Sequence, residues 1–133
     1  MEQSLREVEG MIDFQSGFVK LSPIDPGSVT NTVDPLLIDG EGIIAAFKGI
    51  RDSVVFTNKR IIAVNVQGLT GKKTDYTSMP YSKVQMYSIE TSGVFDRDCE
   101  LELYFSAVGK VKFEIRGNFD IVGFNRILSS YVL

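Results

Sequence analysis

The basic side chains between residues 48 and 73 are the part of this sequence best suited to binding chemistry. Lysine and arginine donate charge-assisted hydrogen bonds to phosphate and carboxylate groups. If the pairs Lys59-Arg60 and Lys72-Lys73 meet at one rim of the fold, they could hold such an anion. The alternative is that they are solvated loop charges and that Arg60 ties its hairpin to a neighbouring acid. The full set of candidate anion- or lipid-binding residues is Lys48, Arg51, Lys59, Arg60, Lys72 and Lys73.

Acidic residues alternate in the segment 96–102, where they could offer oxygen ligands to a hard cation. They are Asp96, Asp98, Glu100 and Glu102. The segment lacks the glycine and the terminal glutamate of an EF-hand loop. The alternative is a solvated strand face whose carboxylates pair with Lys110 and Lys112. We therefore expect no metal site.

Catalytic chemistry finds no support in this sequence. The chain contains no histidine, so the single cysteine, Cys99, cannot form a Cys–His pair and is expected to be structural. The segment 68–73 lacks the spacing of a phosphate-binding P-loop, and strand-like residues follow it. No nucleophile with a base is present, so we expect no catalytic residue, no cofactor and no enzymatic activity.

Several aromatic residues are candidates for a protein interface. Tyr87 is in phase with Ile89, which predicts a core position. Exposed aromatic side chains are enriched at protein interfaces, and the alternative is that each ring shields its own strand. The candidate interface residues are Tyr76, Tyr81, Phe95 and Tyr104.

Composition sets the class of protein. A chain of 133 residues with 44% hydrophobic and 23% charged residues is expected to form one globular domain. The net charge of −3 excludes general nucleic-acid binding and leaves at most peripheral contact with a membrane. A lone cysteine, a charged N-terminus and the absence of a long apolar stretch favour a cytoplasmic protein.

The first 38 residues read as an N-terminal extension with one or two short helices. The spacing of apolar residues predicts an amphipathic helix over 4–14. Asp25-Pro26 resembles an N-cap followed by proline at the first helical position, and an apolar stripe continues to Ile38. Pro35 should kink that helix or split it into two. We therefore divide the chain into the extension 1–38 and a second part, 39–133, within a single domain.

From residue 43 onward the pattern predicts β-strands. Asn58-Lys59 is the expected corner of a hairpin, because asparagine tolerates the left-handed backbone of two-residue turns. Pro80 makes its strand an edge or bulged strand. The last two strands alternate cleanly between apolar and charged residues, which indicates one buried and one solvated face. The predicted strands are 43–48, 54–57, 60–66, 75–81, 84–91, 100–105 and 110–116.

A C-terminal amphipathic helix should close the fold. Asn118 is the expected cap, and Asp120 lies in the first turn, where a negative charge suits the helix dipole. The apolar stripe must be buried against the open end of a curved sheet. It consists of Ile121, Phe124, Ile127, Leu128 and Tyr131.

Three segments resemble the signature of the bacterial pleckstrin-homology (PH) domain family. They are Ile50-Arg-Asp-Ser-Val-Val-Phe-Thr-Asn-Lys-Arg-Ile61, Gln67-Gly-Leu-Thr-Gly-Lys-Lys73 and Ile89-Glu-Thr-Ser-Gly93. The resemblance covers residues 34–133, whereas residues 1–33 match less well and look like a lineage-specific extension. It implies a mainly β, partly open PH-like barrel of about seven antiparallel strands in two near-orthogonal sheets, capped by the C-terminal helix.

The resemblance also implies a function. Members of this family are small, cytoplasmic and without known catalysis, and several look like ring-shaped homo-oligomers, of which a pentamer is one form. Eukaryotic relatives bind phosphoinositides through a basic cluster on the first strand pair. Here the corresponding loop offers only Lys48 and Arg51, with Asp52 beside them. This departure weakens the case for phosphoinositide binding.

Two functional hypotheses follow. The first is a non-enzymatic scaffold that self-assembles into a homo-oligomer and presents surfaces to an unknown protein partner, using unpaired strand edges. The candidate edges are the strand 75–81 and the strand pair 100–116. The alternative is peripheral binding of anionic lipid headgroups, or of another anion, through the basic loops.

Overall fold

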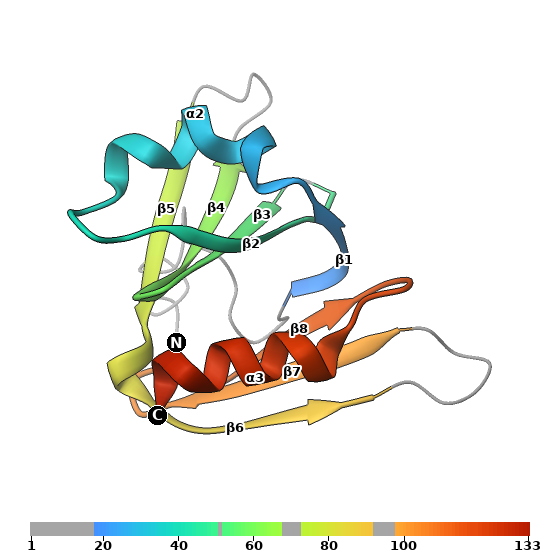
Figure 1. The fold of residues 1–133 in the computed structure, drawn as a ribbon. Coiled ribbons are helices and arrows are strands. Elements are labelled where there is room, and N and C mark those ends of the chain that lie inside the picture. Colours follow the sequence, from blue (N-terminus) through green and yellow to red (C-terminus); the bar gives the residue numbers. More distant parts are fainter. Residues whose placement is uncertain (1–17, 51, 68–72, 92–97) are drawn as a thin grey trace, which may run out of the picture.

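The fold is an eight-stranded, strongly curved sheet closed on one side by a helix (Figure 1). The computed structural model describes residues 18–50, 52–67, 73–91 and 98–133. Along the sheet the strand order is β5-β4-β3-β2-β1-β8-β7-β6. The strands are β1 (Phe18–Ile24), β2 (Ile43–Lys48), β3 (Asp52–Thr57), β4 (Arg60–Gln67), β5 (Lys73–Pro80), β6 (Val84–Glu90), β7 (Cys99–Phe105) and β8 (Gly109–Ile115).

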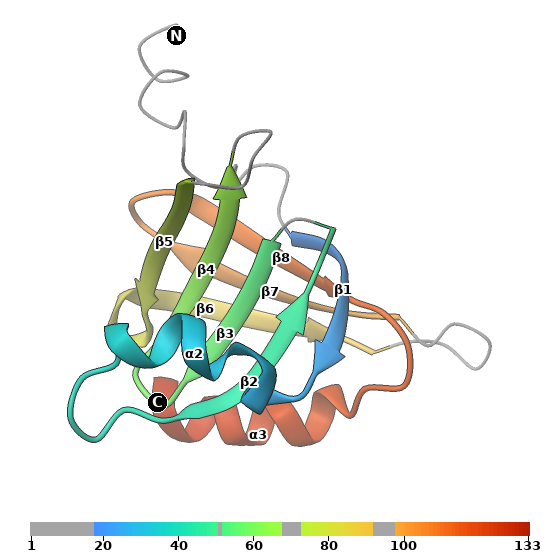
Figure 2. The same cartoon turned by 90° about the horizontal axis from the view of Figure 1, so that it is seen from above.

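This architecture confirms the predicted PH-like fold, with one strand more than expected. The half β2–β5 crosses over the half β6–β8, and α3 (Ile121–Val132) lies along one side of the opening between them (Figures 1 and 2). Strand β1 joins the two halves, because it pairs antiparallel with β2 and parallel with β8. The two expected sheets are therefore one continuous sheet.

Strand β1 lies within the segment that the sequence pattern assigned to a helical extension. Its buried residues, Phe18 and Leu21, are three positions apart, so the strand shows no alternation to recognise. The register against β8 shifts between these two residues, and Lys20 has a positive φ of 55°. This irregularity lets both side chains reach the core and hides the strand from a period-two search. The predicted helix 4–14 lies outside the described residues.

Short helical turns cover the outer face of the β2–β4 half (Figure 2). They are η1 (Pro26–Val29), α2 (Thr30–Val33) and η2 (Asp34–Leu36), so the predicted helix is split, and Pro35 lies in the last turn. Asp25 caps the first turn by accepting a hydrogen bond from the Gly27 N–H at 2.9 Å, as its sequence context predicted. A second, smaller hydrophobic cluster forms beneath them from Val29, Val33, Ala46, Val55, Ile62 and Val64.

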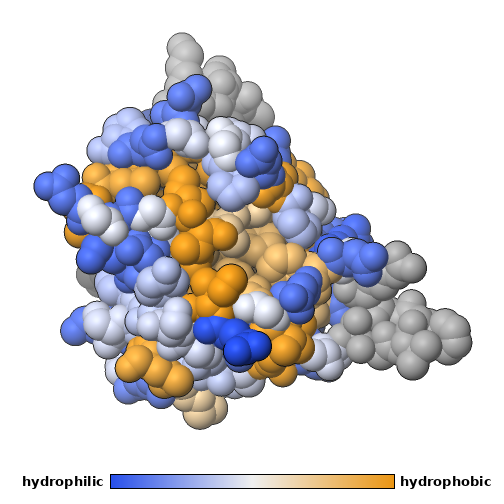
Figure 3. Space-filling model, in the orientation of Figure 1, coloured by the Kyte–Doolittle hydropathy of each residue, from blue (hydrophilic) through white to orange (hydrophobic). Residues whose placement is uncertain are grey.

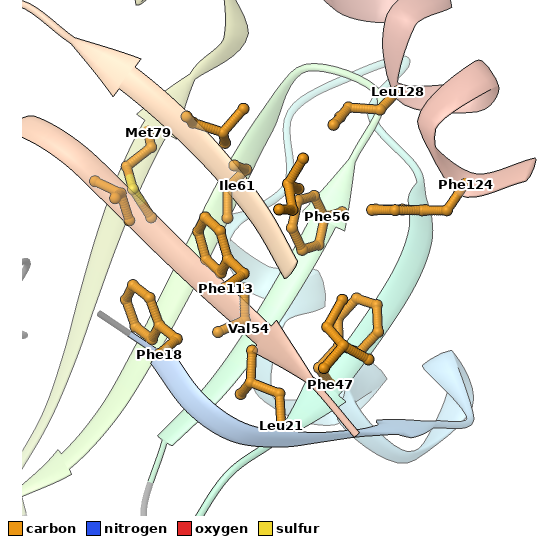
Figure 4. Packing of buried hydrophobic residues seen from close by; sticks show 14 of the residues in the cluster. Phe18, Leu21, Phe47, Val54, Phe56, Ile61, Met79, Phe113, Phe124 and Leu128 are labelled. Carbon is orange, nitrogen blue, oxygen red and sulfur yellow. The ribbon is translucent and has the colours of Figure 1, made fainter. Parts of the chain in front are cut away.

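The main core fills the space inside the curved sheet (Figure 4). Phe47 makes edge-to-face contacts with Phe56, Phe119 and Phe124, which join β2, β3 and the helix. Only Ile121, Phe124 and Leu128 of the predicted helical stripe are buried. Ile127 and Tyr131 are 49% and 44% exposed. The face of the helix that contacts the sheet is therefore narrower than the sequence spacing predicted.

The N-cap of α3 also differs from the prediction. Asp120, not Asn118, caps the helix by accepting a hydrogen bond from the Gly123 N–H at 3.0 Å. The helix begins at Ile121, three residues after Asn118, so the asparagine is too far from the first free N–H groups to serve as the cap.

Candidate functional site

The candidate site is the opening between the two ends of the sheet. Strand β5 is one end and β6 is the other, and each pairs with a single neighbour in the described part of the chain. The 3-10 turn η3 (Tyr81–Lys83) connects them, so both edges diverge from the same corner (Figure 1). The edge prediction for 75–81 is confirmed. The prediction for 100–116 is wrong, because β7 pairs with β6 and β8, and β8 pairs with β7 and β1.

The backbone groups that β5 leaves unpaired follow from its register. Tyr81 donates its N–H to the Lys59 carbonyl at 3.3 Å, next to the pair Arg60–Pro80. Backbone groups of successive residues in a strand point in alternate directions, and the β4–β5 register runs without a shift. The N–H and C=O groups of Thr74, Tyr76 and Ser78 therefore point outward from the sheet and can accept another strand.

A mainly apolar pocket of about 490 Å³ opens beside this edge. It lies between the end of β5, the η3 turn and the β7–β8 turn. Met79, Phe105 and Val108 supply apolar surface, and Thr77 and Lys83 contribute polar groups. This combination of an unpaired edge and an adjoining pocket can bind an extended segment that carries an apolar side chain.

Those predicted anion-binding residues that the structure describes do not converge. Arg60 begins β4 opposite Pro80, whereas Lys73 lies opposite Gln67 at the far end of the same pair. Seven residue steps separate these positions, a distance of about 23 Å along the strand. Lys59 adjoins Arg60, and Lys48 lies at the same end of the sheet as Lys73, three strands away. Arg51 and Lys72 lie outside the described residues.

Arg60 is instead engaged by Glu41, as the alternative interpretation predicted. Its Nε lies 2.9 Å from Glu41 Oε2 and its Nη2 lies 3.0 Å from Oε1, so the contact is bidentate. The same guanidinium donates to the Leu36 carbonyl at 2.7 Å and to Ser78 Oγ at 2.9 Å. Arg60 thus joins the loop before β2, strand β4 and the edge strand β5, and has little capacity left for an external anion.

Glu41 is held as a carboxylate by its surroundings. Its side chain is shielded from solvent, which by itself raises the pKa of the carboxyl. Hydrogen bonds from Arg60, from the Thr57 hydroxyl at 2.6 Å and from the Ile38 N–H at 3.1 Å act in the opposite direction, as does the Arg60 charge. The net effect is a pKa below the ordinary value.

The β3–β4 turn forms where the sequence predicted it but by a different mechanism. Among the described non-glycine residues only Lys20 has a positive φ, so Asn58 is not left-handed. Thr57 Oγ1 accepts hydrogen bonds from the N–H groups of Lys59 and Arg60, each at 3.0 Å. The Asn58 side chain accepts from the Gly42 N–H and donates to the Gly40 carbonyl, both at 2.9 Å. The turn is therefore fixed by side-chain hydrogen bonds.

A sequence model of the bacterial PH domain matches residues 13–132. The chain belongs to the bacterial PH domain family. The match begins at residue 13, so family likeness extends further toward the N-terminus than the three motifs indicated. This agrees with the place of β1 inside the sheet of this PH domain.

Relatives of this PH domain occur in Bacillus subtilis. The uncharacterised protein YjqA is 43% identical over 97 residues, which span 73% of this chain and 76% of YjqA. The uncharacterised protein YozO is 35% identical over 71 residues, 53% of this chain and 61% of YozO.

Two crystal structures resemble this PH domain at 34% sequence identity. One is a DUF1696 family protein with a PH domain from Shewanella loihica, with a TM-score of 0.72 over 88% of this chain and 99% of the other. The second is a PH domain from Shewanella amazonensis, with a TM-score of 0.61 over 98% of both chains.

The aromatic residues of this PH domain occupy three different environments. Tyr76 is 40% exposed on the β5 edge. Tyr81 is only 3% exposed and donates its hydroxyl to the Thr57 carbonyl at 2.6 Å, so its ring belongs to the core and not to the surface. Burial raises the pKa of Tyr81, and the Glu41 charge raises it further. Tyr104 is partly exposed and donates to Glu102 Oε2 at 3.1 Å, whereas Phe95 lies outside the described residues.

The acidic strand face pairs internally. Lys112 Nζ lies 3.2 Å from Glu100 Oε1, and Lys110 Nζ lies 3.8 Å from Glu102 Oε1, as the alternative interpretation predicted. Cys99 is buried, and burial raises the pKa of its thiol. Within the described ranges no three acidic, cysteine or histidine side chains are grouped to hold a metal ion. No helix in those ranges is long and apolar enough to cross a membrane.

Sequence reasoning overlooked Glu41 and Met86. Glu41 stands between two glycines, and no local pattern marks it because its partner Arg60 lies 19 residues away. Met86 is 56% exposed on β6, in phase with exposed Ser88 and Glu90. A large apolar residue on an otherwise polar strand face was a detectable signal.

Proposed function

We propose that this PH domain is a non-enzymatic interaction module that self-assembles into a homo-oligomer and presents surfaces to a protein partner. The proposal rests on the two strands at the ends of the sheet, each of which has one free edge. Strand β5 is eight residues long and β6 is seven. Edges of this length are templates for pairing with another chain unless charge, proline or a covering segment protects them. Strand β6 has one charged residue, at its end, and no proline.

Exposed apolar side chains support the same proposal. Figure 3 shows hydrophobic surface across the middle of one face, where the two halves of the sheet approach α3. Val122, Ile127 and Tyr131 of α3 are each 44–52% exposed. Apolar surface of this kind marks association sites in many soluble proteins. The two edges are different surfaces, so a contact between β5 of one copy and β6 of the next is heterologous and can close into a ring, such as a pentamer.

Binding of anionic headgroups is the second candidate, and one observation favours it. Ile50 is 83% exposed in the β2–β3 turn, beside Lys48 and at the same end of the sheet as Lys73. An exposed apolar tip with flanking lysines can contact a membrane surface. Vesicles containing 30% phosphatidylserine test this candidate at low salt. Binding that is lost in the Lys48→Glu plus Lys73→Glu variant would favour it, and no binding would exclude it.

Hydrogen exchange at two protein concentrations tests the assembly proposal. Outward amides of Thr74, Tyr76 and Ser78 have no partner within the described chain, so they should exchange rapidly in dilute protein. If the edges pair between copies, peptides covering 73–80 and 84–90 should become protected as the concentration rises. Peptides from α3 supply the internal control, because their amides are bonded within the helix at any concentration.

The outcome that contradicts the proposal is equally direct. If the outward amides of β5 and β6 exchange rapidly at both ends of a hundredfold range of concentration, the edges do not pair between copies. Protection that rises in another element instead would place the interface there and remove the argument from the edges.

A further inference from the structure

The pocket between the end of β5, the η3 turn and the β7–β8 turn has the size and lining of a small-molecule site. Its volume is about 490 Å³. Core side chains form its floor, because Met79 and Phe105 line it and are only 5% and 6% exposed. Val108, which is 44% exposed, stands at the rim. Mainly apolar pockets of this volume commonly bind small ligands.

Backbone pairing fixes the walls of the pocket relative to one another. Phe105 pairs with Val84 of β6 on one side and with Gly109 of β8 on the other. Lys83 immediately precedes Val84, so this register brings Lys83 beside Phe105. Gly109 has a φ of 79°, a left-handed conformation that favours glycine at the β7–β8 turn. The pocket is therefore built into the sheet.

Lys83 is the one charged side chain among the described residues that line the pocket. It is exposed and forms no ion pair with another described residue. The two hydroxyl groups from β5 are already engaged. Thr77 donates to Asp75 Oδ2 at 2.6 Å, and Ser78 accepts from Arg60 at 2.9 Å. The ammonium group of Lys83 is thus the charged donor that remains for a ligand.

A neighbouring acid gives the pocket an electrostatic direction. Asp75 lies two residues before Thr77 on the same face of β5, outside the pocket lining. Its carboxylate repels an anion at the Thr77 end, whereas Lys83 attracts an anion at the η3 end. A ligand with one anionic head and one apolar chain matches this arrangement when the head lies at Lys83 and the chain lies on Met79 and Phe105.

We propose that this pocket binds a small apolar carboxylate of the medium-chain fatty acid type, with its carboxylate on Lys83 and its hydrocarbon chain against Met79, Phe105 and Val108. The head group gains a charge-assisted hydrogen bond, and the chain is removed from water. A single lysine suits a single negative charge. This inference goes beyond the proposed interaction module and does not require self-assembly.

Titration with decanoate, followed at the methionine methyl groups, tests this proposal. Met79 lines the pocket, whereas Met86 of β6 does not, so one ¹³C-methyl spectrum contains both a reporter and a control. Decanoate should shift the Met79 methyl signal saturably, with a dissociation constant between about 10 μM and 1 mM for a ligand of this size. The Met86 signal should not move. Met79→Leu and Met86→Leu spectra assign the two signals.

Two variants test the head and the chain of the ligand separately. Lys83→Glu should weaken decanoate binding at least about tenfold and leave binding of uncharged 1-decanol unchanged, because only the carboxylate needs the cation. Ala107→Trp, at an exposed position of the lining, should fill the pocket and weaken binding of both ligands. Lys48→Glu, at an exposed lysine outside the lining, is the matched control and should change neither. Circular dichroism checks that each variant folds.

The possible results either support or overturn the proposal. A saturable Met79 shift that Lys83→Glu abolishes for decanoate but not for 1-decanol supports it. Equal binding of decanoate by the wild type and by Lys83→Glu contradicts the carboxylate assignment. A Met79 signal that does not move at about 1 mM decanoate overturns the pocket as a ligand site. Self-assembly is judged separately, by the mass of the unliganded protein in solution.

Discussion

Glu41 joins three separate segments of the chain through its hydrogen bonds. It accepts hydrogen bonds from the loop residue Ile38, from Thr57 of β3 and from Arg60 of β4. Through Arg60 the same network reaches Leu36 and Ser78 of the edge strand. A shielded carboxylate with this many donors rigidifies the hairpin that carries β4 and, with it, the inner neighbour of the β5 edge.

Substitution of Glu41 should therefore change both stability and its pH dependence. We expect Glu41→Gln to lower the free energy of unfolding by about 2 kcal/mol at pH 7, because Arg60 loses a charged, bidentate partner. The folded-state pKa of Glu41 lies below its ordinary value of 4.5. The carboxylate thus stabilises the fold fully above that value, and this contribution is lost as the pH falls through the folded-state pKa. Urea unfolding between pH 3 and 7 should show a shallower acid decline in the variant.

The exposed pair Lys110–Glu102 supplies the matched control. Its side chains are 51% and 22% exposed, so Glu102→Gln should change the free energy of unfolding by no more than about 0.5 kcal/mol at pH 7. An equal loss in the two variants would contradict the structural role given to Glu41.

Part of the hydrogen-bond network around Glu41 and Arg60 could be predicted from the sequence. Binding of Arg60 to an acid was foreseen, but not which acid, because the hairpin alone does not say which loop lies beside it. An anion site required Lys59-Arg60 and Lys72-Lys73 to meet at one rim, and of their described members Arg60 and Lys73 lie at opposite ends of the β4–β5 pair. A strand separates its two ends by its full length, so residues at opposite ends of one pair cannot share a ligand.

At the scale of elements, the position of the edge strand β6 depends on the N-cap of α3. Asp120 caps the helix through Gly123, whose missing Cβ leaves the space that the Asp120 carboxylate occupies. The helix then places Phe124 against Phe47 and Phe56, and Tyr87 of the edge strand β6 shares a 2.6 Å hydrogen bond with Ser129. The packing of α3 against the core therefore stabilises the position of β6.

Substitutions at the N-cap of α3 should therefore change the free energy of unfolding. Asp120→Ala should lower the free energy of unfolding by about 1 kcal/mol, the usual cost of losing a helix N-cap. Gly123→Ala should change the value by less than about 0.5 kcal/mol, because the roughly 1 kcal/mol that alanine ordinarily adds in a helix interior is offset when its Cβ displaces the capping carboxylate. Asn118→Ala should change the value by less than about 0.5 kcal/mol. Thermal and urea unfolding give all three values, and a Gly123→Ala variant that is more stable by about 1 kcal/mol would contradict the account.

Most elements were predictable because their signal is local. Strands β2 to β8 and the final helix show alternation or helical periodicity in short windows, and Pro80 identified β5 as an edge. Strand β1 was missed because a bulge with Lys20 at positive φ removes its alternation. The second edge was misplaced, since β7 and β8 are covered by β6 and by β1, and the pairing with β1 depends on that missed strand.

At the scale of the whole molecule, the sheet is strongly curved but not closed. Its two ends meet at the η3 corner and then diverge, which leaves two different edges and a pocket between the halves. The aromatic core and α3 hold the curvature, so these edges keep a fixed relation to one another. A rigid unit with two unlike, unpaired edges is suited to repeated contact between copies.

The mass of the protein in solution tests this claim most directly. Light scattering after size exclusion, at 50 mM and 1 M NaCl, should give a multiple of the 14.8 kDa chain mass at both salt concentrations. Backbone pairing and apolar contacts are insensitive to screening, so high salt should not dissociate the assembly. A mass of one chain at both salt concentrations, at protein concentrations up to 1 mM, would contradict the account.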